Sequence, residues 1–365
     1  MRIIPVLFLA LLAACTPRGL ITIYPDAEIV GPQQSIFVAT TRARTVDGKF
    51  TSNRSPVVTY LHYDISIPPA RNLGEINWPN TPPDPQTDFL VTKEDRFQSS
   101  SQFISALSKS LRARKQSQRE VVIYVHGFNN NFAEGLYRMA QLSHDFELAQ
   151  PTIHYSWPSA GNPLGYGYDR DSMLYARDGL EELIKTVDRA GAKEILLVGH
   201  SMGALLVMET LRQISIENPD TAARLIDGVA LLSPDIDIEL FKQQTRRIGR
   251  LPDPFVIFTS RKDRALRLSA RLTGQKARLG NVDDARLLAD LEVTLVDVSE
   301  FSTGGTGHFT TAKSPALIRI FASLPEIDAA FSRDRSGRSG LLPGTVLVVQ
   351  KATEIILLPV SKKTP

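Results

Sequence analysis

The chain has 365 residues, of which 42% are hydrophobic and 22% are charged. These fractions are typical of globular proteins and exclude a disordered chain, a collagen-like fibre and a protein with many membrane spans. The 42 basic and 39 acidic residues leave a net charge of +3, which is too small to indicate nucleic-acid binding. A single cysteine excludes an intrachain disulfide and a metal site built from several thiolates.

The first fourteen residues are typical of a removable signal. One arginine precedes an apolar stretch, residues 3–12, that is broken only by Pro5 and is too short to cross a bilayer of roughly 30 Å. The sequence Leu12-Ala-Ala-Cys15 resembles the lipobox of bacterial lipoproteins, in which the cysteine is acylated and becomes the new N-terminus. This resemblance implies a lipid anchor at Cys15, and Thr16 after it implies the outer membrane, on its periplasmic face. An ordinary buried strand with a chance cysteine is the alternative.

After this anchor, residues 15–34 are expected to form a tether. Residues 35–40 and 57–67 are rich in β-branched side chains and predict two strands. Six prolines within residues 68–85 predict a loop. Apolar residues at helical spacing in residues 103–111 then predict a helix.

From residue 121 onward, apolar strands alternate with amphipathic helices. This rhythm predicts a mostly parallel sheet with helices on both faces, in one domain over residues 35–325. Residues 326–365 are expected to form a C-terminal extension, with a two-stranded hairpin over 344–360. The predicted strands are residues 121–125, 153–157, 195–198, 228–232, 255–259 and 293–298, and the predicted helices are residues 132–148, 169–190 and 202–216.

The pentapeptide Gly199-His-Ser-Met-Gly203 carries the strongest chemical signal. It follows a predicted strand and opens an apolar helix, which is the context of a nucleophile elbow. There the glycines permit a tight turn, and the serine is exposed at the carboxyl end of the strand. Ser201 is therefore the candidate nucleophile, unless the glycines only allow the helix to pack closely on the sheet.

A second glycine-containing segment, Val125-His-Gly-Phe-Asn-Asn130, ends an earlier buried strand. In this position it can supply a second N–H donor to an oxyanion beside the serine. The predicted donors are the backbone N–H groups of Phe128 and Met202, and His126 is expected to brace the loop.

His308, in Gly304-Gly-Thr-Gly-His-Phe309, is the candidate general base because it is the only histidine downstream of the serine. His200 is expected to point down from the elbow. The triad also needs an acid between the serine and this histidine. Asp263 and Asp235 both follow strands, and each has a structural alternative, as a helix cap and a turn residue respectively. Asp263 is favoured because its strand neighbours the one that precedes the histidine.

These motifs, together with Phe37-Val-Ala-Thr-Thr-Arg42 and Ser156-Trp-Pro-Ser159, resemble the α/β-hydrolase superfamily. More closely, the chain is similar to a bacterial group of hydrolases of unknown function, of the DUF900 type, over residues 35–325. The resemblance implies an α/β-hydrolase fold and a serine hydrolase mechanism of esterase or lipase kind, without naming a substrate.

The function expected from these motifs is hydrolysis of a small-molecule or lipid acyl ester, with no metal or organic cofactor implied. Trp157 and Asn129 are candidates for the substrate pocket, and Trp157 fits a core position equally well. An envelope scaffold that keeps the fold without turnover is the alternative from another class. A haloalkane-processing member is disfavoured, because it would carry an aspartate where this chain has Ser201. The sequence carries no signal for an oligomeric state.

Overall fold

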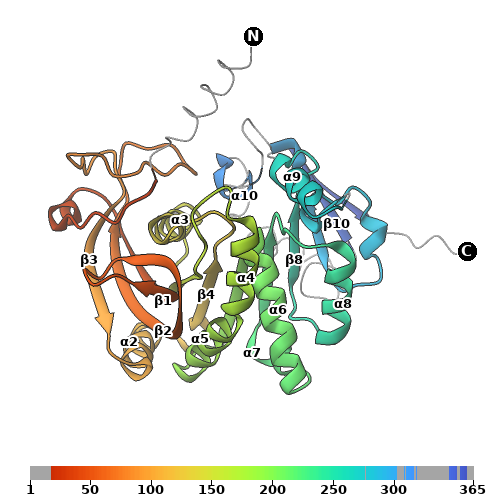
Figure 1. Cartoon of the computed structure of the whole chain (residues 1–365), viewed down its shortest axis with the longest axis horizontal. Helices are drawn as coiled ribbons and strands as arrows, with labels where there is room; N and C mark the ends of the chain where they lie inside the picture. The colour runs from red at the N-terminus through yellow and green to blue at the C-terminus, as the bar shows by residue number, and fades with distance from the viewer. Residues whose placement is uncertain are drawn as a thin grey trace, which may run out of the picture.

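A computed structural model describes residues 18–275, 277–301, 308, 310–315, 318, 345–351 and 354–359. Its centre is one sheet of eleven strands in the order β11-β10-β9-β8-β7-β6-β4-β5-β1-β2-β3. The eight strands from β10 to β1 run parallel, and antiparallel pairs are added at both edges. The mostly parallel sheet predicted from the sequence is confirmed. The helices of the described chain are arranged around this sheet (Figure 1). The signal-like segment and its Cys15 lie outside the described residues.

Buried β-branched runs form the central strands. The strands are β1 (Gln33–Arg44), β2 (Phe50–Ser66), β3 (Leu90–Phe97), β4 (Glu120–Val125), β5 (Thr152–Ser156), β6 (Glu194–His200), β7 (Gly228–Leu232), β8 (Phe255–Thr259), β9 (Thr294–Asp297), β10 (Thr345–Lys351) and β11 (Glu354–Pro359). The C-terminal hairpin joins the sheet through parallel pairing of β10 with β9.

Helices lie on both faces of the sheet, as expected. The α-helices are α2 (Ser100–Arg112), α3 (Phe132–Asp145), α4 (Tyr166–Tyr175), α5 (Arg177–Arg189), α6 (Met202–Glu217), α7 (Thr221–Leu225), α8 (Ile238–Ile248), α9 (Arg264–Leu272) and α10 (Thr310–Lys313). Alternate side chains of β1 divide the core. Ile36 and Val38 pack with α3, whereas Phe37 and Ala39 pack in the larger cluster that includes α2, α5, α6 and α8. This alternation follows from the two-residue period of a strand.

The predicted tether is wrong from residue 18 onward. The short 3₁₀ helix Pro25–Ile29 packs on the domain with Ala27 fully buried, and the backbone N–H of Tyr24 donates to Val91 of β3 at 2.8 Å. Strand β1 already begins at Gln33. The N-terminal segment is therefore part of the folded body, because β3, which the sequence analysis did not predict, offers it an edge.

The predicted helix over residues 169–190 is also wrong, since two helices meet at Ala176. The hydroxyl of Tyr155 on β5 donates to the carbonyl of Ala176 at 2.7 Å. This contact comes from a distant strand, so helical periodicity could not reveal it. Segment 68–85 contains neither helix nor strand, as its prolines predicted.

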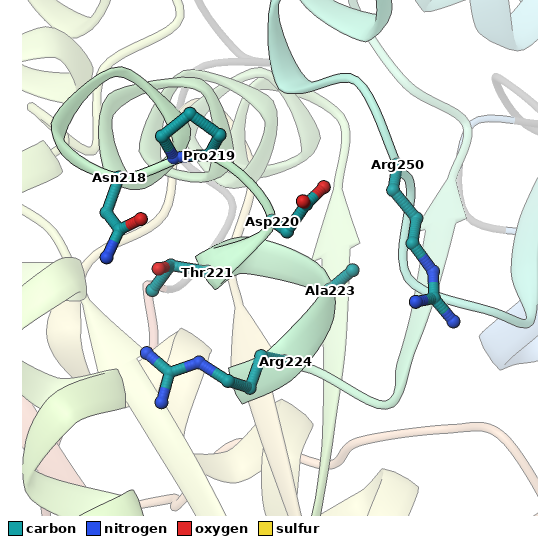
Figure 2. Close-up of a pocket in the computed structure, with 7 residues that line it drawn as sticks. All are labelled: Asn218, Pro219, Asp220, Thr221, Ala223, Arg224 and Arg250. Carbon is teal, nitrogen blue, oxygen red and sulfur yellow. The ribbon is translucent and has the colours of Figure 1, made fainter.

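Among the described residues, none of the helices is long and apolar enough to span a bilayer. A surface hollow of about 480 Å³ lies at the carboxyl end of α6, opposite the end that carries Ser201 (Figure 2). With sixteen residues, α6 separates the two by about 24 Å. The lining offers no nucleophile–base pair, and we assign no function to the hollow; it consists of Asn218, Pro219, Asp220, Thr221, Ala223, Arg224 and Arg250.

Candidate active site

Ser201 occupies a strained turn between β6 and α6. Its φ of 54° and ψ of −119° lie outside the regions that L-residues prefer. The backbone of the neighbouring strand end holds this conformation: the N–H of Ser201 donates to Leu232 at 2.9 Å, and its carbonyl accepts from Asp235 at 3.1 Å. These hydrogen bonds hold the strained backbone in place, so that the side chain of Ser201 projects from the carboxyl edge of the sheet.

The two glycines of the elbow are required by close packing. A β-carbon at Gly203 would lie 2.3 Å from the carbonyl oxygen of His126, and one at Gly199 would lie 2.7 Å from the Cα of Ala204. Both distances are shorter than a carbon atom allows. Helix α6 can therefore approach the ends of β4 and β6 only with glycine at these positions, which sets the place of Ser201.

The structure brings Ser201, His308 and Asp263 into one hydrogen-bonded chain. Nε2 of His308 lies 2.9 Å from Oγ of Ser201, and Nδ1 lies 2.8 Å from Oδ2 of Asp263. An ionised carboxylate only accepts hydrogen bonds, so Nδ1 carries the proton and Nε2 accepts from the serine hydroxyl. Asp263 is fully buried, the side chain of His308 is 20% exposed and Ser201 is 2% exposed. The arrangement can withdraw the serine proton toward a histidine that is oriented by a buried carboxylate.

Asp263 makes two contacts at once. Its Oδ1 accepts from the backbone N–H of Leu266 at 2.9 Å and caps α9, while Oδ2 faces His308. The helix cap and the triad acid, considered as alternatives from the sequence, are compatible because a carboxylate has two oxygens. The cap also fixes the rotation of the carboxylate that orients the imidazole.

The competing acid, Asp235, is fully engaged elsewhere. Its Oδ1 accepts from Ser269 at 2.6 Å and lies 3.1 Å from Nε of Arg278, and its Oδ2 accepts from Tyr166 at 2.9 Å. Asp235 and Arg278 are only 3% and 2% exposed. Burial and the neighbouring Asp235 raise the pKa of Tyr166, whose hydroxyl therefore stays protonated and donates. Asp235 forms a structural cluster beside the elbow rather than a contact with His308.

The β4–α3 loop, residues 126–131, lies against the elbow. A β-carbon on Gly127 would be 2.9 Å from the Cβ of Ser201, so this loop and the serine are in direct apposition. Neither Phe128 nor Met202 has a hydrogen-bond acceptor for its backbone N–H within the part of the chain that the structure describes. Met202 is the first residue of α6, where a helix leaves its N–H groups unpaired. Within the described chain, neither of the two predicted oxyanion donors is therefore committed to another acceptor.

The buried side chain of His126 supports this loop from the core. Its ring is fully buried, with Nδ1 2.8 Å from the carbonyl of Gly127 and Nε2 3.0 Å from that of Trp157. The rings of His126 and Trp157 stack at 4.8 Å, and the indole N–H donates to the His126 carbonyl at 2.7 Å. The expectation that Trp157 lines a substrate pocket is wrong, because its side chain is fully buried in the core and braces the loop.

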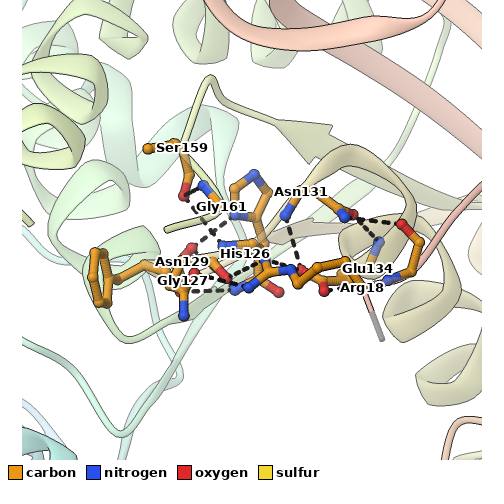
Figure 3. A network of polar contacts seen from close by, with 12 residues as sticks. Arg18, His126, Gly127, Asn129, Asn131, Glu134, Ser159 and Gly161 are labelled. Carbon is orange, nitrogen blue, oxygen red and sulfur yellow. Dashed lines mark hydrogen bonds and ion pairs between the residues drawn. The ribbon is translucent and has the colours of Figure 1, made fainter. Parts of the chain in front are cut away.

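Arg18 also holds the β4–α3 loop through a network of polar contacts (Figure 3). Its guanidinium donates to Oδ1 and to the carbonyl of Asn129, both at 3.0 Å, and to Glu134 at 2.6 Å. Asn129 has a φ of 58°, a left-handed conformation that these contacts stabilise. As a pocket candidate, Asn129 is corrected as well, since its side-chain oxygen faces Arg18. Glu134 also completes the capping box of α3 with Asn131.

Asp169 fixes the backbone of the same loop from α4. Its carboxylate accepts from the N–H of Asn129 at 3.1 Å, the N–H of Ala160 at 2.6 Å and the hydroxyl of Ser159 at 2.5 Å. The buried Arg42 donates to the carbonyls of Asn130 at 2.8 Å and Ser159 at 3.0 Å, and burial lowers its pKa to about 10. Two loops and one N-terminal strand therefore share a single polar network behind the site.

His200 differs from the sequence expectation. Its ring does not point away from the site but lies with its centroid 5.0 Å from that of His308. Burial and the neighbouring His308 hold the pKa of His200 well below its usual range. A neutral imidazole at this position adds no positive charge that would compete with an imidazolium at His308.

Sequence reasoning missed Arg18, Asp169 and Tyr166. Arg18 was assigned to the tether, and nothing local distinguishes Asp169 or Tyr166 from surface residues of a helix. Arg42 did have a signal, since it closes the motif that begins at Phe37. Among the described residues, no group of three or more histidine, cysteine or acidic side chains is arranged to hold a metal ion.

A parallel sheet with a serine at a strand-to-helix turn, and a histidine and an aspartate on the loops that follow later strands, defines an α/β hydrolase. Residues 100–324 match the model of a family described as alpha/beta hydrolase of unknown function (DUF900), and the chain belongs to this family.

Comparison with solved structures gives low identities. A protein of Agrobacterium vitis S4 described as a hydrolase is 12% identical, with 81% of this chain and 98% of that chain covered and a TM-score of 0.36. An esterase of Pyrococcus furiosus is 11% identical, with 87% and 97% covered and a TM-score of 0.34. A YdeN-like hydrolase of Pectobacterium atrosepticum is 19% identical, with 61% and 98% covered and a TM-score of 0.33. A comparison with curated protein sequences found no match.

Proposed function

We propose that this protein is a serine hydrolase that cleaves acyl esters. The observation that carries the proposal is the continuous hydrogen-bonded chain from Asp263 through His308 to Ser201. A serine with only a structural role would not require a strained backbone together with a hydrogen-bonded imidazole and a buried carboxylate behind that imidazole. The family supports a hydrolase, and the ester as its substrate is our inference from the site.

The reaction follows from the directions of these hydrogen bonds. Ser201 attacks the acyl carbonyl while Nε2 of His308 takes its proton, and the imidazolium then returns the proton to the leaving alcohol. Asp263 remains ionised, holds the Nδ1 proton and stabilises the imidazolium. A water molecule repeats the sequence on the acyl-enzyme, releasing the acid and restoring the free serine.

The tetrahedral oxyanion is expected to accept hydrogen bonds from the N–H groups of Phe128 and Met202. Met202 directly follows Ser201, and Phe128 follows Gly127, which packs against Ser201. Neither N–H has another acceptor in the described chain, and the N-terminus of α6 contributes positive potential there. Removing one donor from such a site typically costs about 10² to 10³ in kcat. Asp169 and Arg18 would keep Phe128 in place through the backbone of Asn129.

The test is the hydrolysis of p-nitrophenyl esters of increasing acyl length by wild type and by Ser201→Ala. We expect the variant to lose on the order of 10⁶ in kcat and to keep its fold, because the substitution removes a single oxygen atom. A fluorophosphonate probe should label wild type at Ser201 and leave the variant unlabelled. A folded wild type that neither turns over nor reacts with the probe would favour the scaffold alternative.

We further propose that the mature protein begins at an acylated Cys15 and is held on the periplasmic face of the outer membrane. The lipobox-like sequence supports this anchor, and more than one acyl chain would make it stable without a transmembrane helix. Mass spectrometry of the membrane-extracted protein should find a lipid-modified Cys15 at the N-terminus. An unmodified Cys15 or a retained Met1 would contradict the proposal.

A further inference from the structure

Helix α9 presents an exposed face that combines basic and apolar side chains. Leu266, Ser269 and Ala270 are buried against the domain. On the outer side, Leu268 is 57% exposed and Leu272 is 65% exposed. The arginines of this helix share the outer side. We call this surface the α9 face; it consists of Arg264, Arg267, Leu268, Arg271 and Leu272.

The region around α9 is strongly basic. Residues 261–278 contain seven basic residues and one acidic residue, the buried Asp263. The whole chain has a net charge of only +3, so the remainder is net negative. Within the described residues, Arg264 and Arg271 have no acidic partner, and Arg267 donates only to a backbone carbonyl at 3.4 Å. These three positive charges are therefore not neutralised by the protein itself.

The α9 face adjoins the candidate active site. Asp263 caps the first turn of α9 while it contacts His308. Helix α10, which follows His308, lies at the same end of the molecule as α9 (Figure 1). Whatever binds the α9 face is consequently held beside the rim of the site.

We propose that the α9 face docks onto an anionic phospholipid surface. Single exposed leucines are ordinary, but two of them interleaved with three unpaired arginines on one helix are typical of helices that lie in a membrane interface. The leucines would enter the acyl boundary and the arginines would contact lipid phosphates. The face has no aromatic side chain on which a nucleic-acid base could stack, which favours lipid over nucleic acid as the polyanion. The proposal concerns binding alone and is independent of the chemistry at Ser201.

The binding test uses vesicles of phosphatidylcholine alone or mixed with phosphatidylglycerol. The full chain carries Cys15→Ser in every sample, which removes the proposed lipid anchor, and Ser201→Ala, which removes the proposed turnover. Replacing the three α9 arginines by glutamine should weaken sedimentation with the mixed vesicles on the order of a hundredfold, since each basic residue contributes about a factor of five. The protein with wild-type α9 should bind only weakly to vesicles of phosphatidylcholine alone.

A matched control removes the same charge elsewhere. Arg246, Arg247 and Arg250 are exposed at the end of α8 and just beyond it, and Arg250 lines the hollow in Figure 2. Glutamine at all three of these positions should leave vesicle binding unchanged. An equal loss in both triple variants would reduce the effect to net charge and overturn the proposal.

A second readout reports the depth of α9. In the Cys15→Ser chain, Leu268→Cys provides the only thiol for a polarity-sensitive fluorophore, and Ile216→Cys, at 43% exposure in the native side chain, is the control on α6. The label at 268 should shift to the blue with mixed vesicles, and the label at 216 should not. Equal binding of heparin with the same arginine dependence, and no shift of the label at 268, would assign the face to a soluble polyanion instead.

Discussion

The two contacts of Asp263, with the N-terminus of α9 and with His308, make a crossed prediction possible. In Asp263→Asn the side chain keeps an oxygen that can cap α9, and asparagine and aspartate are about equally good at that position. The amide group then faces His308, so Nδ1 must accept and the proton moves to Nε2, which can no longer take the serine proton. We expect kcat to fall by about 10⁴. The free energy of unfolding should fall by less than about 1 kcal/mol, from the lost charge near the helix N-terminus.

Asp235→Asn should give the opposite pattern. Asp235 faces the guanidinium of Arg278, and both are almost completely buried. Removing its charge leaves Arg278 without a counterion, which should cost about 3 kcal/mol of unfolding free energy. Because Asp235 does not contact His308, kcat of the folded variant should stay within about tenfold of wild type.

The two variants are compared by steady-state hydrolysis of a p-nitrophenyl ester and by urea unfolding of the same preparations. Asp263→Ala is a third sample that lacks both roles and should lose the cap as well, at about 1 kcal/mol. If Asp235→Asn loses more kcat than Asp263→Asn, the triad acid is Asp235 and the reasoning from the hydrogen bonds is refuted.

Three further variants, the first with a matched control, probe the elbow, the β4–α3 loop and one buried histidine. Gly203→Ala should lower the unfolding free energy by about 3 kcal/mol, because its β-carbon would lie 2.3 Å from the carbonyl oxygen of His126. The control Gly167→Ala should leave it unchanged, because a β-carbon there would have no atom within 4 Å. Equal urea midpoints for the two variants would contradict this. Arg18→Ala should lower kcat by about tenfold, or about 1.4 kcal/mol of barrier, with little change in KM, since it holds the β4–α3 loop; an unchanged kcat would show that the loop needs no such support. Burial lowers the pKa of His154 to about 3, so on acidification the unfolded state takes up the proton before the folded state does. The free energy of unfolding should therefore fall as the pH drops from about 6.5 toward 3, by about 2 kcal/mol for this residue at pH 5. His154→Gln should flatten that decline in urea unfolding; an unchanged slope would exclude His154 as a contributor.

The sequence by itself determined the parallel sheet and the place of the serine. Both depend on local patterns: continuous apolar runs form buried strands, and Gly199-His-Ser-Met-Gly203 between an apolar strand and an apolar helix is typical of a tight strand-to-helix turn. His308 was the candidate base because it is the only histidine downstream of the serine. These features are encoded within a few residues of where they act, so periodicity and turn chemistry are sufficient to find them.

Only the tertiary structure decided what surrounds the serine. The sequence favoured Asp263 and kept Asp235 as the alternative, and the contact of Asp263 with His308 and the ion pair of Asp235 with Arg278 distinguish them. The sequence allowed either a pocket or a core position for Trp157, and the structure places it in the core, where it stacks on His126, 31 positions earlier in the chain. Arg18 reaches Asn129 across 111 positions. Contacts over such distances depend on which strands become neighbours and how closely the helices pack, and no local pattern of residues encodes them.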